Sequence, residues 1–324
     1  MRRFKNILQS NSGVALITVI LIISILVAAA LELNRSSRND VYSASNLSDG
    51  IKLTCIAKSG FYGAAALLTN SRSDYETLRD DWANAENLSA QSKTFFPRGR
   101  FIVKIEDEKG KIPLNKLVTG GVVDTNIEGV LLQLLKQPEF KLEGNKAAEI
   151  VDAIIDWVDD NEEITGMGAE SAYYASLNPP YAAKNAQLDC IEELLMIRGI
   201  HPNLFSGTKE QLGLGQFVTI YGTGVININT APKMVLRALS PDITVELADK
   251  MDEYRKQGSN ELSSADWYKK VSGMGGVTIN SKLIEVAKSE YFKIYSTGVS
   301  DKMEQRISGV IQRQPFKILS WRQE

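Results

Sequence analysis

Seven carboxylates lie within the nineteen residues that end at Glu170: Asp152, Asp156, Asp159, Asp160, Glu162, Glu163 and Glu170. Carboxylates this dense in a turn-rich segment repel one another unless a cation joins them. Calcium suits such a segment, because it takes about six to eight oxygen ligands in a flexible geometry. The sequence therefore predicts a calcium site. It leaves open a solvated acidic loop in which Asp156 or Asp159 caps a helix end.

The acidic segment is not an EF-hand. Asp159, Asn161 and Glu163 stand at alternate positions, as in the first half of that calcium loop. Ile164 follows where the EF-hand requires a glycine for its sharp turn.

Other site chemistry has little support in the chain. There is one histidine, His201, so a nucleophile–histidine arrangement would depend on a single imidazole. Cys55 and Cys190 form no CxxC or Cys/His cluster, so neither a zinc site nor a redox motif is indicated. The two cysteines either form a disulfide in an oxidising compartment or stay as separate buried thiols. The net charge of −2 gives no basic surface for nucleic acid. We expect a protein that is not an enzyme.

The N-terminus carries a membrane anchor. The run from Val14 to Leu31 is apolar apart from Thr18 and Ser24, and as a helix it would be about 27 Å long, near the minimum for crossing a bilayer. Arg2, Arg3 and Lys5 precede this run, and the positive-inside rule therefore keeps the N-terminus in the cytoplasm and sends the remaining residues outward across the membrane.

A basic leader that ends in glycine before the apolar run resembles the leader of prepilins. The resemblance implies that prepilin peptidase cuts between Gly13 and Val14 and that the new N-terminus is methylated. Two alternatives stay open. One is a secretory signal peptide cleaved near Ala28-Ala29-Ala30, and the other is a signal anchor that is never cleaved.

Periodicity beyond Leu31 continues the anchor as a helix. Apolar residues recur at helical spacing, at Leu47, Ile51, Cys55, Tyr62 and Ala66, which indicates an amphipathic helix. A cleaved signal peptide would have no reason to continue in this way. The pattern therefore favours one long helix that serves first as an anchor and then as a spine.

Strand patterns flank a long helical region. Alternation predicts strands over 101–107, 111–115, 291–298 and 303–313, with turns at 108–110 and at 300–302. The intervening residues predict helices around 131–135, 147–158, 190–197, 232–239, 245–255 and 264–271, with Thr230 as the N-cap of the fourth. We therefore predict an α+β fold: a pilin-like long N-terminal helix with an antiparallel sheet, interrupted by a large all-α domain.

Ordered motifs resemble one family over nearly the whole chain. After the glycine-terminated leader they are Asp107-Glu108-Lys109-Gly110-Lys111-Ile112, Asp156-Trp157-Val158-Asp159, Gly168-Ala169-Glu170, Pro179-Pro180-Tyr181 and Ile226-Asn227-Ile228-Asn229-Thr230-Ala231. Together they are similar to the general secretion pathway protein K family, the K-type minor pseudopilins of type II secretion systems. The resemblance implies a leader (1–13), an anchor and filament core (14–31), the first part of a pilin head (32–116), an inserted α-domain (117–289) and the last strands of the head (290–324).

The resemblance also implies a role and partners. A K-type pseudopilin caps the tip of the periplasmic pseudopilus with the I and J minor pseudopilins, and it is anchored in the inner membrane until it is assembled by the inner-membrane secretion platform. Contacts with secreted cargo or the outer-membrane channel are a further expectation. The family's association with calcium implies the ligands Asp156, Asp159, Asn161 and Glu170.

One position departs from most prepilins. Counted from Val14, the fifth mature residue is Thr18, whereas prepilins usually carry glutamate there to meet the N-terminal amine of a neighbouring subunit. An unpaired buried charge is costly, so a subunit without this glutamate is poorly suited to repeat along a shaft and fits the tip. K-type pseudopilins share this absence.

Residues 226–276 resemble a helix-hairpin-helix unit, which in other proteins presents backbone amides to DNA phosphates. Here Pro241 and Asp242 occupy the first hairpin, where the proline removes an amide and the aspartate repels phosphate. We expect a structural use of these helix-hairpin-helix or SAM-like units, without nucleic acid. The alternatives are a single-pass periplasmic binding protein, DNA among its ligands, and a minor pilin of a type IV pilus.

Overall fold

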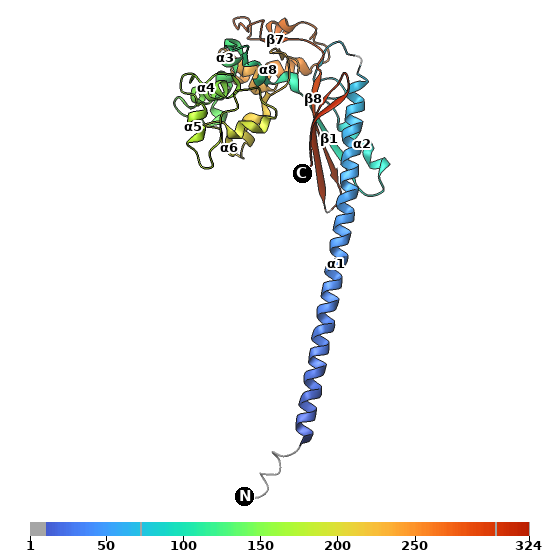
Figure 1. Ribbon diagram of the computed structural model, residues 1–324. Coiled ribbons are helices and arrows are strands. Elements are labelled where there is room, and N and C mark those ends of the chain that lie inside the picture. The colour runs from blue at the N-terminus through green and yellow to red at the C-terminus, as the bar shows by residue number, and fades with distance from the viewer. Residues whose placement is uncertain (1–10, 72, 302, 324) are drawn as a thin grey trace.

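One helix, α1 (Asn11–Thr69), dominates the computed structural model, which describes residues 11–71, 73–301 and 303–323 (Figure 1). Its apolar segment is fully exposed, and α1 is long and apolar enough to cross a membrane. The hydroxyls of Thr18 and Ser24 donate to the carbonyl oxygens of Val14 and Ile20 at 2.9 and 2.8 Å, so neither presents an unsatisfied group to lipid. Residues 1–10 of the predicted leader lie outside the described residues.

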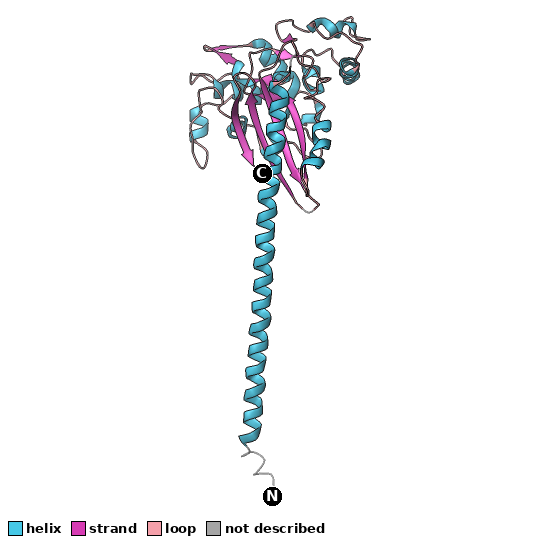
Figure 2. Cartoon of the chain, turned by 90° about the vertical axis from the view of Figure 1, so that its right-hand side faces the viewer, coloured by secondary structure: helices cyan, strands magenta, loops and turns pink. Residues whose placement is uncertain are grey.

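The last turns of α1 pack on a four-stranded antiparallel sheet (Figure 2). The sheet has the order β1-β8-β9-β10, formed by β1 (Arg100–Asp107), β8 (Tyr291–Val299), β9 (Glu304–Gln312) and β10 (Lys317–Gln323). Strand β8 buries every second residue, including Phe292 and Ile294, toward α1. The head therefore has its own core between one face of the sheet and the helix. The predicted strands 101–107, 291–298 and 303–313 are confirmed; Lys302 of the second predicted turn lies outside the described residues.

The buried face of α1 is opposite to the stripe that periodicity selected. Leu47, Ile51 and Tyr62 are 67%, 58% and 51% exposed, and Cys55 and Ala66 are also exposed. The head core instead takes Leu53, Ile56, Ala57, Phe61, Ala64, Ala65 and Leu68. The helix is apolar on both sides here, and small alanines on the buried side let the sheet approach closely. The predicted helix is correct, but its predicted core face is wrong.

Helix α2 (Glu86–Phe95) covers the outer edge of β1. Ser92 Oγ donates to the carbonyl of Phe101 at 3.1 Å, and Ser89 Oγ accepts the amide of Val103 at 3.0 Å. These hydroxyls replace the hydrogen bonds that a neighbouring strand would make at this edge.

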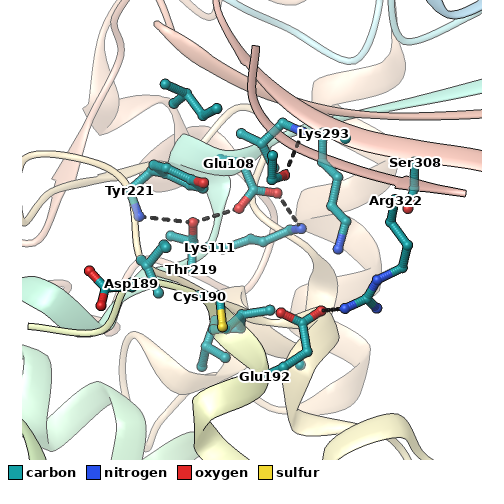
Figure 3. A pocket seen from close by; sticks show the side chains of 18 of the residues that line it. Glu108, Lys111, Asp189, Cys190, Glu192, Thr219, Tyr221, Lys293, Ser308 and Arg322 are labelled. Carbon is teal, nitrogen blue, oxygen red and sulfur yellow. Dashed lines mark hydrogen bonds and ion pairs between the residues drawn. The ribbon is translucent and has the colours of Figure 1, made fainter. Parts of the chain in front are cut away.

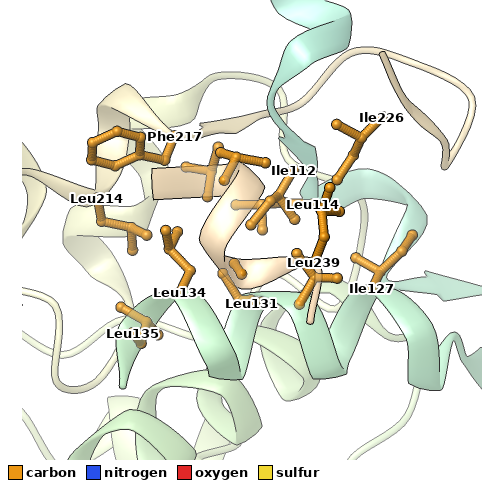
Figure 4. Close-up of a cluster of buried hydrophobic side chains, with 14 of the residues drawn as sticks. Ile112, Leu114, Ile127, Leu131, Leu134, Leu135, Leu214, Phe217, Ile226 and Leu239 are labelled. Carbon is orange, nitrogen blue, oxygen red and sulfur yellow. The ribbon is translucent and has the colours of Figure 1, made fainter. Parts of the chain in front are cut away.

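Between β1 and β8 the chain builds a second unit with a separate core (Figure 4). Its α-helices are α3 (Thr125–Leu135), α4 (Lys146–Val158), α5 (Ser171–Ala175), α6 (Pro202–Ser206), α7 (Lys233–Ala238) and α8 (Val245–Lys256). Three two-stranded pairs brace it: β2 (Ile112–Pro113) with β5 (Val218–Thr219), β3 (Val118–Thr119) with β4 (Val122–Val123), and β6 (Ile226–Asn227) with β7 (Ile284–Glu285). Ile112 and Leu114, which we assigned to the head, lie in this second core. We call the unit the α-domain.

Several predicted elements take another form. The segments predicted as helices at 190–197 and 264–271 are 3₁₀ helices, Ile191–Met196 and Ala265–Lys270. The strand predicted at 111–115 is only Ile112–Pro113, and it pairs in parallel with β5. Pro232, and not Thr230, is the N-cap of α7, because the Thr230 hydroxyl bonds elsewhere. Cys55 and Cys190 are free, exposed thiols, so the structure contains no disulfide between them and the two are not buried.

Candidate cation site and buried junction

Three carboxylates meet at the end of α4, in the segment that the sequence marked for calcium. Asp156 lies in the last turn of α4, Asp159 is its C-cap, and Glu170 is the N-cap of α5. One oxygen from each lies within 4.8 Å of the others, and all three side chains are buried. The chain thus folds back over residues 160–169 to bring Glu170 to the other two. We call these three residues the carboxylate cluster.

Some carboxylate oxygens of the carboxylate cluster have no hydrogen-bond partner among the described residues. Asp156 Oδ1 accepts the amide of Thr165 at 2.9 Å, and Asp159 Oδ1 accepts the amide of Asn161 at 3.4 Å. Asp156 Oδ2 and both carboxylate oxygens of Glu170 have no hydrogen-bond donor among the described residues. Buried oxygens left unpaired are costly, and a bound cation would satisfy them.

The pKa shifts of the three carboxyl groups also favour a bound cation. Burial raises the pKa of Asp156 and of Asp159 above the usual range. Burial, followed by the nearby charges of Asp156 and Asp159, raises the pKa of Glu170 to about 7. A divalent cation would remove this repulsion and lower all three pKa values. The donor set is entirely oxygen, which suits calcium better than zinc or copper.

Asn161 is not one of the three clustered side chains, because both polar atoms of its side chain make hydrogen bonds within the loop. Its amide nitrogen donates to Asp159 Oδ2 at 2.9 Å, and its Oδ1 accepts the amide of Glu163 at 2.6 Å. The structure therefore brings together three of the four predicted ligands and leaves the fourth holding the loop beside them.

Two glycines let the loop close. A Cβ on Gly168 would lie 2.1 Å from Asp156 Oδ2, and one on Gly166, whose φ is +50°, would lie 2.4 Å from Asp152 Oδ2. Arg198 fastens the same turn, since its guanidinium donates to the carbonyl of Gly168 at 3.0 Å and stacks over Tyr173. Only glycine fits at the first position of the Gly168-Ala169-Glu170 motif, because a side chain there would overlap Asp156.

A second polar cluster joins the head to the α-domain, and no sequence pattern indicated a role for it. Asp107, at the end of β1, is buried and accepts the hydroxyls of Thr230 and Ser289 at 2.6 and 2.8 Å. Its other oxygen accepts the amide of Lys109 at 2.9 Å. Burial raises the pKa of Asp107 to about 6.

Two buried ion pairs flank Asp107. Lys111 contacts Glu108 at 2.7 Å, and Arg313 contacts Glu76 at 2.6 Å, where Trp82 also donates its indole N–H. We call Asp107 and these two pairs the buried junction. Its only signal in the sequence is that Asp107-Glu108-Lys109-Gly110-Lys111 and Asn227-Ile228-Asn229-Thr230 belong to the motifs that carried the family resemblance.

Comparisons with known proteins place the α-domain in one family. Two family models, each described as type II secretion system (T2SS) protein K, match residues 110–210 and 226–287, together half of the chain. The type II secretion system protein K of Aeromonas hydrophila is 29% identical over 61% of this chain and 62% of its own length. That of Klebsiella pneumoniae is 27% identical over 60% and 59%, so the chain spans about three fifths of these two relatives. That of Pseudomonas aeruginosa is 25% identical over 94% of this chain and 90% of its own length.

A solved structure shares the fold. A chain of the GspK-GspI-GspJ complex from the type 2 secretion system of enterotoxigenic Escherichia coli superposes with a TM-score of 0.64 and 18% identity, over 88% of this chain and 99% of that one. At this level of identity the likeness shows that the two chains share a fold.

Proposed function

This chain belongs to the type II secretion system protein K family, and from that premise we propose that it is a minor pseudopilin that caps the periplasmic pseudopilus and helps to initiate its assembly. The observation that carries the proposal is the continuity of α1. The same helix exposes an 18-residue apolar segment at one end and packs on the sheet of the head at the other. It therefore serves as a membrane anchor and, after extraction, as part of a filament core.

The orientation follows from the charges that flank the anchor. The basic N-terminus stays in the cytoplasm, and the head and α-domain lie in the periplasm. Prepilin peptidase cuts after Gly13, and Val14 becomes a methylated N-terminus. The protein has no catalytic role of its own; the inner-membrane secretion platform supplies the work of extraction.

We infer the partners from the make-up of the similar structure, which is a complex of GspK with GspI and GspJ. The corresponding I and J minor pseudopilins are the neighbours we propose for this chain. Thr18 supports a place at the tip, because its hydroxyl is satisfied by its own helix and offers no carboxylate to a neighbour's ammonium group. The α-domain would then face the outer-membrane channel and the secreted cargo.

The carboxylate cluster is proposed to hold calcium. Asp156, Asp159 and Glu170 would supply carboxylate oxygens, and Asn161 would position Asp159 through its amide. Bound calcium would supply positive charge that ties α4 to α5, so the loop between them becomes ordered. The unpaired oxygens of Asp156 and Glu170 support this role.

The residues 226–276 are proposed to be structural helix-hairpin-helix units. Lys269 pairs with Asp266 at 2.7 Å, and Lys233 pairs with Asp249 at 2.7 Å, so these cations already have acidic partners. Salt-dependent binding of DNA by the full chain would contradict this use.

Mass spectrometry of the mature N-terminus tests the main proposal. In cells with a type II secretion system, we expect a chain that starts at N-methylated Val14. Gly13→Ala should block this cut and secretion, whereas Gly50→Ala, where no atom lies within 4 Å of an added Cβ, should be processed normally. A chain that starts at Met1 or Leu31 would contradict the proposal, as would normal secretion by an unprocessed Gly13→Ala variant.

A further inference from the structure

Four large apolar side chains beside α5 are open to solvent: Ile164, Met167, Tyr173 and Met196, which are between 37% and 62% exposed. They come from the loop after α4, from α5 and from the 3₁₀ helix Ile191–Met196. We call these four residues the apolar patch. In Figure 1, α5 lies on the side of the α-domain that points away from α1 and the sheet, so the head leaves the patch open.

Contacts around Arg198 join the patch into one surface. The Arg198 guanidinium lies 5.0 Å from the centre of the Tyr173 ring and contacts the carbonyl oxygen of Met167 at 3.5 Å. Met196 precedes Arg198 by two residues, and its carbonyl accepts the hydroxyl of Tyr181 at 2.7 Å. Exposed apolar side chains that gather within a polar rim mark interaction sites, and methionine and tyrosine are enriched in them.

The exposed charges next to the patch are acidic. Asp160, Glu162 and Glu163 directly precede Ile164, and none of the three has an ion-pair partner in the part of the chain that the structure describes. Glu162 accepts the hydroxyl of Ser171 at 2.8 Å, a neutral donor that leaves its charge in place. These acids lie outside the carboxylate cluster, so a cation bound to the cluster would not pair with them one to one. The surroundings of the patch therefore favour a basic partner.

The cavity of about 350 Å³ between the α-domain and the sheet is less selective (Figure 3). Its charges are matched internally, since Lys111 contacts Glu108 at 2.7 Å and Arg322 contacts Glu192 at 2.7 Å. Lys293 lies 5.2 Å from the centre of a tyrosine ring. The cavity thus favours neither sign of charge, in contrast to the apolar patch and its acidic rim.

We propose that the apolar patch binds a basic, apolar segment of another protein. Aliphatic or aromatic side chains of that segment pack on Met167, Tyr173 and Met196, and a lysine or arginine next to them meets Asp160 and Glu163. The apolar contacts supply most of the affinity, and the acids speed the encounter and reject acidic segments. The inference deepens the contact proposed above between the α-domain and other proteins, because it names the surface and the chemistry that this surface recognises.

Selection of phage-displayed peptides on the full-length chain tests the proposal. The chain is held in nanodiscs of zwitterionic lipid, and empty nanodiscs first remove peptides that bind lipid. We expect enriched peptides that combine apolar residues with lysine or arginine, and we expect a synthetic copy of one to bind more weakly as the salt concentration rises.

Two variants examine the two kinds of contact separately. Tyr173→Ser should weaken the synthetic peptide about tenfold or more, because it removes a central aromatic anchor, whereas Tyr173→Phe keeps the ring and should bind normally. Glu163→Lys should weaken the peptide about threefold or more, because it replaces attraction with repulsion. The matched controls are Val245→Ser and Glu246→Lys, exposed changes on α8 that should leave binding unchanged.

The proposal is wrong if no peptide is enriched, if the enriched peptides are acidic, or if Tyr173→Ser and Glu163→Lys bind as tightly as the original chain. Equal losses in Tyr173→Ser and Val245→Ser would also overturn it. Thermal unfolding of each variant shows whether the α-domain is intact. Processing at Gly13 is measured independently, so failure here is distinguishable from failure of the assembly role.

Discussion

Gly298 is a point where the sheet lies close against α1, and an alanine there should separate the two. A Cβ on Gly298 would lie 2.2 Å from the carbonyl oxygen of Leu53 and 3.1 Å from the amide nitrogen of Ala57. Both are backbone atoms of the helix, so no side-chain rotation can relieve the overlap. The backbone of Gly298 itself accepts any residue, because it has no positive φ. Steric room alone decides the outcome.

The size of the effect follows from the overlap. The helix must retreat by about 1 Å to restore an ordinary contact, and a gap of that size forfeits about a quarter to a half of each dispersion contact it opens. Leu53, Ala57 and Phe61 all lie in the affected part of the head core. Forced overpacking typically costs about 1–3 kcal/mol, and backbone overlap places Gly298→Ala toward the upper end, near 3 kcal/mol.

Guanidinium unfolding of the full chain in detergent measures the change. Trp82 lies in the head core and Trp267 in the α-domain core, so single-tryptophan variants follow the two units separately. Gly298→Ala should lower the free energy of unfolding at Trp82 and leave the transition at Trp267 nearly unchanged. Gly50→Ala, on the same helix but free of neighbours, should raise helix stability by about 0.5–1 kcal/mol. If Gly298→Ala unfolds within about 0.5 kcal/mol of the original chain, the close packing of helix and sheet is refuted.

Three further predictions concern the polar clusters. A chelator should lower the melting temperature of the α-domain, since calcium at a hundred times its dissociation constant adds about 2.7 kcal/mol to the free energy of unfolding. Asp156→Asn should abolish this response, and Asp160→Asn, at an exposed position, should keep it. An unchanged melting temperature would count against a calcium site. Asp107 has a folded-state pKa of about 6, above its unfolded value of 3.8, so its contribution to stability is full below about pH 4 and is lost by about pH 6. The free energy of unfolding of the original chain should therefore fall by about 3 kcal/mol over that interval relative to Asp107→Asn. Parallel pH profiles of the two chains would contradict this. Arg313→Met should lower the free energy of unfolding in denaturant by about 3–5 kcal/mol, because it leaves the buried carboxylate of Glu76 without its partner. Lys233→Met, at an exposed ion pair, should lower it by under about 1 kcal/mol. Equal losses would show that burial of the pair is unimportant.

The sequence predicted the elements whose pattern reflects burial on one side. Strand β8 alternates because only one of its faces meets α1, and α4 presents Ile150, Ile154 and Trp157 to one core. Strand β10 was missed because all of its residues are exposed or half-buried at the sheet's edge, so no alternation marks it. The exposed stripe of α1 misled the prediction for the opposite reason, since apolar residues there do not face the core.

The two candidate sites also differ in how far the sequence predicted them. The carboxylate cluster was visible because its acids are close in the chain, although only the fold shows that Glu170 reaches Asp156 while Asn161 stays beside them. The buried junction was not visible, because Asp107 meets Thr230 and Ser289 across separations of 123 and 182 residues. Local spacing carries no information about pairs that only a folded chain brings together. Thr230 shows this directly, since its hydroxyl serves Asp107 and not the nearby helix.

The α-domain leaves and rejoins the head at a single point, because Asp107 at the end of β1 and Phe292 near the start of β8 are register partners. Topologically the whole α-domain occupies the place of a hairpin turn. Such a connection can change in length without changing the order of the strands or the long helix α1. A short turn grafted from Asp107 to Tyr291 should therefore leave a minimal head that still carries the long helix, and the α-domain would be separable from that head.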